Sequence, residues 1–400
     1  MERAGDMADR MNFGIFLTPF HLPNTQNPTW ALSRDVELVK HYDMLGFDEV
    51  WFGEHHSCGC ELIGDPITMI AHCAPQTRHI KLGTGVFSLP YHNPLWAAER
   101  MIFVDHLTRG RAMYGLGPGA LPTDAQMIGI EPSEQRDAFE LDVDVLMHLI
   151  HSDEPISVKT SRYTLNDAMV QLKPYSDFEV AVAAVVSPSG PRIAGKHGLS
   201  LMSIAATMQG GTDALAGHRR IVEERAREFG APAAPRSTWR LLGPMHIAET
   251  RERAVEDVRY GIDLWFDYMQ NVSASPQFSP AGTTTEERIR WVVDSGVGVI
   301  GTPDDAIEQI RRLQEMSDGG FGTYLMMGNE WARFDATKRS CELFAEHVMP
   351  VFQNQNARLR ASERWARGHH DDLHARQTAA LRAASDKHAA EQEAKSVATD

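Results

Sequence analysis

The chain contains little cysteine and no excess of basic residues. Four cysteines in 400 residues (Cys58, Cys60, Cys73 and Cys341) are too few for a disulfide framework, and this usage is typical of a reducing cytoplasm. Lys and Arg number 39 against 54 Asp and Glu, giving a formal net charge of −15 with no basic stripe. The composition therefore argues against a surface that binds nucleic acid.

Long apolar runs are also missing. No stretch of about 18 apolar residues is present, so the sequence predicts no membrane span. The first ten residues, Met1–Arg10, are polar and lack the apolar core of a signal peptide. We interpret them as a disordered leader, with Met11 as an alternative start, and we expect a cytoplasmic protein.

Short apolar strands alternate with amphipathic helices along most of the chain. The predicted strands are Phe13–Leu17, Asp48–Phe52, Ile80–Leu89, Arg111–Leu116, Val180–Val186, Leu199–Ala205, Trp239–Ala248 and Thr323–Met327. The predicted helices are Trp30–Leu45, Pro66–Ala74, Pro94–Leu107, Ser133–Ile150, Ser189–His197, Asp213–Phe229, Arg251–Met269, Pro303–Met316 and Asp335–Phe352. About eight such units predict an α/β fold in which a parallel sheet closes into a (β/α)8 TIM barrel. An open doubly wound sheet is the alternative, and no GxGxxG follows the first strand to support its dinucleotide-binding form.

Three segments depart from this alternation. Residues 155–178 alternate weakly and predict an inserted hairpin, and residues 271–300 are polar, contain two prolines and predict an excursion from the barrel. The barrel domain is expected to span residues 11–355. Residues 356–400 are rich in Ala, Arg, Glu, Asp and His, which predicts a charged tail that is helical or disordered. An arm that clasps a second subunit is its functional interpretation.

The titratable run Glu54-His55-His56 follows the second predicted strand directly. In a barrel of this kind, catalytic groups gather where the strands end, and histidine is the side chain most easily tuned to move protons near neutral pH. A zinc site that adds Cys58 and Cys60 is an alternative. However, adjacent histidines in a strand point to opposite faces, so we interpret His56 as a structural partner and expect no metal.

Two further patterns indicate binding sites, one for a phosphate and one for a flat ring. Ser187-Pro188-Ser189-Gly190 opens a helix, where free backbone N–H groups and the helix dipole attract anions. Arg136 opens another helix and can share the same phosphate if both helices face the barrel mouth. Glycines in Gly83-Thr84-Gly85-Val86 weaken a strand unless something must approach closely, and a flat ring lying on that backbone is one reason for them.

Taken in order, these motifs resemble the bacterial luciferase-like flavin monooxygenases, including the limonene-monooxygenase-like branch. The resemblance covers about Met11–Phe352. It rests on the segments Asn12–Phe16, Gly46–His56, Leu82–Val86, Leu89-Pro90, Asn93-Pro94, Ala98-Glu99, Gly110-Arg111, Ser187–Gly190 and Gly301–Asp304.

The resemblance implies a two-component monooxygenase. A separate flavin reductase supplies reduced FMN, molecular oxygen is the co-substrate, and a C4a-peroxyflavin oxygenates a small hydrophobic molecule such as a terpene, ketone or aldehyde. By the same resemblance His55 lies beside the reactive flavin edge. Arg136, Ser187, Ser189 and Gly190 bind the FMN phosphate, and the ring lies against a cis peptide bond at Gly85-Val86. The family also implies a homodimer or a higher homo-oligomer.

The sequence departs from the luciferases themselves, because Gly117 and Pro118 replace their cysteine and the arginine after it. Light emission is therefore not expected. An oxidoreductase that uses the deazaflavin F420 on the same fold, and a non-catalytic flavin-binding or interaction protein, remain as alternatives. The sequence does not choose between electrophilic oxygenation of an alkene and nucleophilic attack on a ketone.

Several side chains just past the predicted strand ends suit an oily substrate. They are Phe20, His21, Phe87, Tyr91, Leu121, Met208 and Trp331. Each can also serve as plain packing, so the expected pocket is a set of candidates.

Overall fold

The structure is a computed structural model that describes residues 10–18, 20–22, 26–208, 210–273 and 282–397. The predicted leader therefore lies outside the described residues except for Arg10. The chain divides into two compact units, one ending at Gln353 and one from Asn354 to Asp400. No helix among the described residues is long and apolar enough to cross a bilayer.

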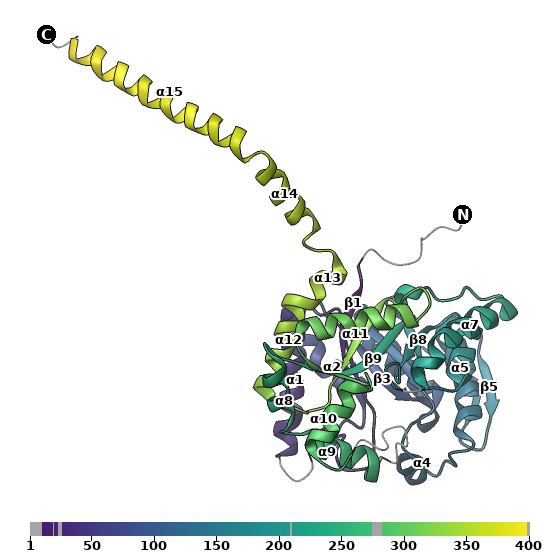
Figure 1. Cartoon of the computed structure of the whole chain (residues 1–400). Coiled ribbons are helices and arrows are strands. Elements are labelled where there is room, and N and C mark those ends of the chain that lie inside the picture. Colours follow the sequence, from purple (N-terminus) through teal and green to yellow (C-terminus); the bar gives the residue numbers. More distant parts are fainter. Residues whose placement is uncertain (1–9, 19, 23–25, 209, 274–281, 398–400) are drawn as a thin grey trace. The chain divides into compact units, whose positions relative to one another are not determined.

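The first unit is a closed barrel of eight parallel strands (Figure 1). In chain order they are β1 Asn12–Leu17, β2 Glu49–Phe52, β3 Lys81–Ser88, β4 Ala112–Gly117, β7 Val180–Ala184, β8 Ser200–Ser203, β9 Arg240–Ile247 and β11 Thr323–Met327. Neighbours pair in the order β9-β11-β1-β2-β3-β4-β7-β8, and a pairing of β8 with β9 closes the ring. This closure confirms the barrel and excludes the open sheet.

Helices follow the strands around the barrel. The longer ones are α1 Pro28–Leu45, α2 Pro66–Cys73, α3 Pro94–Thr108, α5 Gln135–His151, α6 Ser189–His197, α7 Gly211–Phe229, α8 Arg251–Val258, α10 Thr285–Asp294, α11 Pro303–Met316 and α12 Phe334–Leu343. The first three begin with proline directly after an Asn or Asp whose side chain accepts from the free N–H groups of the first turn. Their starts are therefore readable from the sequence.

The structure corrects the prediction of one helix over Arg251–Met269. That segment forms α8, then α9 Ile262–Asp267 and a π-helical turn, η4 Tyr268–Val272. The break falls at Gly261, whose N–H donates to the carbonyl of Trp331 at 2.9 Å. A Cβ at this position would lie 2.2 Å from the carbonyl oxygen of Glu330. The loop after β11 thus presses on the segment and interrupts the helix.

Three short elements were not predicted. Helix α4, Pro122–Ile128, lies between β4 and α5. Within residues 271–300 the chain forms α10 and the short strand β10, Val299–Gly301, which pairs with the end of β9. The prolines of that segment, Pro276 and Pro280, lie outside the described residues. The predicted hairpin is confirmed as β5 Ile156–Lys159 paired with β6 Thr164–Ala168.

The barrel interior is filled by side chains, so it cannot serve as a pore. Its cluster consists of Phe16, Trp51, Met113, Ala181, Met202, Leu242, Leu325 and Met327. Trp51 explains one of the strand glycines, because a Cβ at Gly83 would lie 2.4 Å from its ring. The chemistry of a filled barrel must take place at the ends of its strands.

The second unit is helical. It consists of α14, Ala357–Gly368, and α15, His370–Val397. Of the two forms predicted for the tail, the structure has the helical one. Almost all of its side chains are exposed as far as residue 395.

Candidate active site

His55 stands between two carboxylates just beyond the end of β2. Its Nε2 lies 2.7 Å from Oε2 of Glu61, and its Nδ1 lies 3.2 Å from Oδ2 of Asp124. Burial alone would lower the pKa of His55, but the two carboxylates raise it to about 10. The raised pKa favours the cationic form of the ring at neutral pH, and its side chain is 19% exposed.

Asp124 comes from the unpredicted helix α4 and is 1% exposed. Its second oxygen accepts from the backbone N–H of His56 at 3.1 Å and from the hydroxyl of Ser57 at 2.5 Å. Burial raises its pKa, but these donors and His55 outweigh burial and lower it overall. Asp124 therefore stays ionised and fixes both the loop after β2 and the His55 ring.

Glu54 organises the other side of the loop and is 2% exposed. One oxygen accepts from the backbone N–H of Ser88 at 2.5 Å, which ties the end of β2 to the end of β3. The other lies 3.1 Å from Nε2 of His56 and 2.6 Å from Nε2 of His92. The structural role predicted for His56 is confirmed.

The alternative zinc ligands do not converge. Cys60 is buried, whereas Cys58 is partly exposed beside Thr123 at 3.2 Å. Across the part of the chain that the structure describes, no three His, Cys, Asp or Glu side chains are arranged to hold a metal ion.

The peptide bond between Gly85 and Val86 is cis, as predicted. It interrupts the pairing of β3 with β4 between Thr84 and Phe87. A Cβ at Gly85 would lie 2.7 Å from the Phe16 ring, and one at Gly117 would lie 2.6 Å from the Val86 side chain. Glycines on both strands thus let the backbone adopt this course near the mouth. Contact with a flavin ring stays a prediction.

The predicted phosphate residues lie on two adjacent units of the barrel. Strands β4 and β7 pair directly, and the helices that follow them carry Arg136 and Ser189 in their first turns. Ser187 and Ser189 are joined through their hydroxyls at 2.9 Å, and no side chain caps α6. Gly190 is required because a Cβ would lie 2.3 Å from the carbonyl oxygen of Ala183.

Arg136 is exposed and has no ion-pair partner among the described residues. A free guanidinium, two hydroxyls and uncapped N–H groups form a donor set that fits a phosphate. The residues present therefore fit the phosphate of FMN.

The structure brings three of the seven substrate-pocket candidates together. Phe20, Met208 and Trp331 belong to an apolar cluster that also contains Tyr268 and Trp265. The Phe20 and Tyr268 rings meet edge to face with centroids 5.2 Å apart. This cluster is separate from the main core between the barrel and its helices.

The other four candidates have different surroundings. His21 forms an ion pair with Asp35 at 2.9 Å, and although burial lowers its pKa, Asp35 and Glu330 raise it to about 9. Phe87 is fully buried in the main core and stacks on His92 at 4.0 Å. The remaining two are Tyr91, whose hydroxyl accepts from Gln135 at 3.1 Å, and Leu121, which precedes α4. Their contact with substrate stays a prediction.

A hollow of about 630 Å³ opens beside the His55 group. Its lining residues are Ser57, Cys58, Thr123, Gln126, Met127, Asn271 and Val272. Sequence reasoning named only Cys58 among these residues, as a possible zinc ligand, and it did not find Glu61 or Asp124. The available signal was Pro122 with an acidic residue two positions later, which is a helix start.

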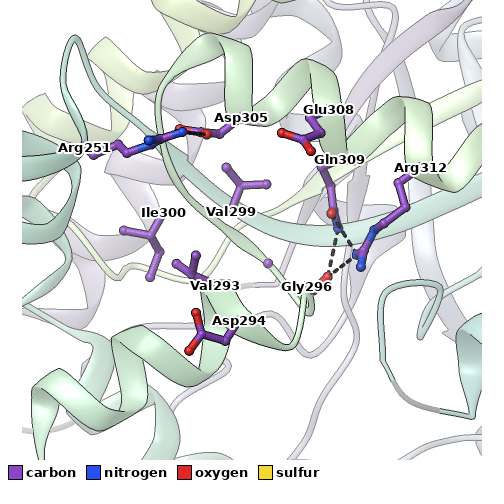
Figure 2. Close-up of a pocket in the computed structure, with 11 residues that line it drawn as sticks. Arg251, Val293, Asp294, Gly296, Val299, Ile300, Asp305, Glu308, Gln309 and Arg312 are labelled. Carbon is purple, nitrogen blue, oxygen red and sulfur yellow. Dashed lines mark hydrogen bonds and ion pairs between the residues drawn. The ribbon is translucent and has the colours of Figure 1, made fainter.

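A second hollow, of about 440 Å³, lies among α8, α10, β10 and α11 (Figure 2). Arg251 is paired there with Asp305 at 2.6 Å, and Arg312 donates to the carbonyl of Gly296 at 2.5 Å. It shares no lining residue with the first hollow or the His55 group.

Comparison with known proteins agrees with this geometry. Residues 11–318 match the family described as luciferase-like monooxygenase. Limonene 1,2-monooxygenase of Rhodococcus erythropolis is 45% identical over 343 residues, which cover 86% of this chain and 87% of the relative. The 4-hydroxyprotoasukamycin monooxygenase of Streptomyces nodosus subsp. asukaensis is 38% identical over 363 residues, which cover 89% of this chain and 96% of the relative.

A solved structure shares the fold. It is the oxygenating constituent of 3,6-diketocamphane monooxygenase from Pseudomonas putida in complex with FMN, with a TM-score of 0.69 and 23% identity, covering 85% of this chain and 98% of that one. The extent of the family match and the identity to the curated relatives place the chain in the luciferase-like monooxygenase family.

Proposed function

We propose that the protein is the oxygenase component of a two-component flavin-dependent monooxygenase. A separate reductase supplies reduced FMN, and the substrate is a small, largely apolar molecule such as a terpene. The observation that carries the proposal is His55, which lies between Glu61 and Asp124 just beyond the end of β2. The neighbouring strand β3 carries the cis Gly85–Val86 bond. Identity to limonene 1,2-monooxygenase supports the terpene class.

Two groups of residues would hold FMN. Arg136 and the first turn of α6 would bind the phosphate, and the backbone of Gly85 and Val86 would support the ring. Bound reduced FMN supplies the activation of molecular oxygen. The protein supplies orientation, exclusion of water and a proton.

His55 can provide that proton. A carboxylate oxygen lies next to each ring nitrogen of His55, and each nitrogen can donate to that oxygen only when it carries a proton. The two carboxylates therefore favour the doubly protonated ring. The ring is then a donor at neutral pH, and Glu61 and Asp124 balance its charge. A proton donor beside the flavin favours oxygen transfer to an electron-rich carbon over attack on a carbonyl.

The test is oxygen consumption with defined cofactors. The purified protein is mixed with limonene and either photochemically reduced FMN or reduced F420, and products are analysed by gas chromatography. The proposal expects an oxygenated product with reduced FMN and none with F420. Turnover with F420 alone would contradict it, and so would the lack of any binding of reduced FMN.

A further inference from the structure

We propose that the hydroxyl of Tyr268 is a hydrogen-bond donor to the substrate, which is therefore a neutral, mainly apolar molecule that carries an accepting oxygen. This inference rests on the proposed function and narrows its substrate class.

The Tyr268 hydroxyl is buried and lacks a partner. Tyr268 lies on η4 and is 3% exposed, and its oxygen has no hydrogen bond within the described residues. A buried hydroxyl without a partner costs stability, so most of them are paired. An unpaired one inside an otherwise apolar cluster indicates that its partner arrives with a ligand.

The surroundings of Tyr268 connect it to His55. Its ring packs against Phe20, whose backbone pairs with that of Glu61 in an antiparallel bridge. Burial raises the pKa of Tyr268, and the nearby carboxylates of Glu61 and Asp124 raise it further. Glu61 and Asp124 flank His55, while Cys58 lines the hollow. Asn271 and Val272, in the same turn as Tyr268, line the hollow. The turn η4 therefore connects Tyr268 to the hollow, and Phe20 connects it to Glu61 beside His55.

A second unpaired donor belongs to the same cluster. Trp331 is fully buried, and its indole Nε1 has no hydrogen-bond partner among the residues described. An indole N–H can only donate. Two unsatisfied donors in one apolar cluster favour a ligand oxygen over a ligand N–H.

The charges nearby narrow the ligand further. Glu61 and Asp124 repel an anion, so a carboxylate or phosphate ligand is disfavoured. The apolar cluster around Tyr268 also contains Phe20, Met208 and Trp265, which suit contact with a hydrocarbon skeleton. A site built to hydrogen-bond an oxygen also discriminates strongly against the analogue that lacks it. A cyclic terpenoid ketone or alcohol satisfies all three conditions.

The experiment compares carvone with limonene, which have the same skeleton with and without a ketone. Dissociation constants are measured by calorimetry with the chain as purified, and kcat/KM is measured with reduced FMN. We expect the wild type to favour carvone by at least about tenfold. Tyr268→Phe should weaken the binding of carvone by about tenfold and leave the binding of limonene unchanged. Tyr175→Phe, which removes a hydroxyl from an exposed ring elsewhere, is the matched control.

Thermal unfolding gives an independent readout. Because the Tyr268 hydroxyl has no partner, Tyr268→Phe should be as stable as the wild type or more stable. A clear loss of stability would show that the hydroxyl has a partner within the chain, and it would overturn the inference. A preference for limonene, or an equal effect of the variant on both ligands, would also overturn it.

These failures differ from a failure of the proposed function. If reduced FMN does not bind and neither compound is oxygenated, the function is wrong, but calorimetry and unfolding still decide the role of Tyr268. If both compounds are oxygenated with equal efficiency, the function stands and the inference falls.

Discussion

The barrel carries a buried three-membered ion group at each end, and the two differ in the cation at the centre. At the start of the strands Arg240 lies between Glu49 and Glu179, with N–O distances of 2.8 and 2.6 Å. At the mouth His55 lies between Glu61 and Asp124. Arginine cannot lose its proton in a protein, whereas histidine can. We therefore propose that the same arrangement serves stability at one end and proton transfer at the other.

The largest effect is expected at the Arg240 end. Arg240→Met leaves Glu49 and Glu179 without a buried counter-charge, which should lower the free energy of unfolding by about 3–5 kcal/mol. Denaturant unfolding measures this loss. Arg290→Met, on the exposed face of α10, should change stability little. An equal loss in both variants would remove the special role of the buried group.

Replacing His55, unlike replacing Arg240, should lower activity and leave stability largely unchanged. His55→Gln removes the proton donor, so kcat should fall by about 10²–10⁴-fold while the fold and FMN binding persist. Coupled oxygenation assays and FMN titration separate the two quantities. His72→Gln, on the exposed side of α2, is the control. Full activity of His55→Gln would place the chemistry elsewhere.

Glu61→Gln tests how the group of His55, Glu61 and Asp124 responds to pH. The pKa of His55 in the folded protein is about 10, above the ordinary value of 6.5. Its contribution to stability is therefore fully present below about pH 6.5 and is lost as pH rises through 10. Removing the Glu61 charge should lower the pKa of His55, so the protein should lose less stability between pH 6.5 and 10. It should also reduce kcat about tenfold.

Unfolding at a series of pH values gives the measurement, with Glu131→Gln as the exposed control. A pH profile identical to that of the wild type would mean that Glu61 does not hold the proton on His55.

The smallest effect concerns a second arginine, Arg136. Arg136 is exposed and unpaired within the described chain, unlike Arg240, so Arg136→Gln should leave stability unchanged. It should weaken FMN about tenfold, because one charge-assisted hydrogen bond to phosphate is lost. Fluorescence titration with FMN measures this, and unchanged affinity would remove Arg136 from the phosphate site.

The sequence predicted the barrel well because its signals are local. Periodicity marked the strands, and proline in a first turn marked a helix start at Pro94. The run at His55 was found because it directly follows a strand. The cis bond at Gly85 was predicted only through the family resemblance, since no local pattern requires it.

The partners of His55 were missed because they are distant in sequence or lie in short elements. Asp124 is 69 positions away and lies on a helix of seven residues, too short for a periodic pattern. Glu61 lies in an irregular loop. The Gly261 break depends on contact with the loop after β11, which no local pattern encodes.

The most direct test of the central claim is an NMR titration of the His55 ring in the flavin-free protein, assigned with His55→Gln. If Glu61 and Asp124 hold the ring as a cation, its carbon and nitrogen shifts stay those of imidazolium from pH 6 to beyond pH 8, since its pKa is about 10. A transition near or below pH 6.5 would contradict the account.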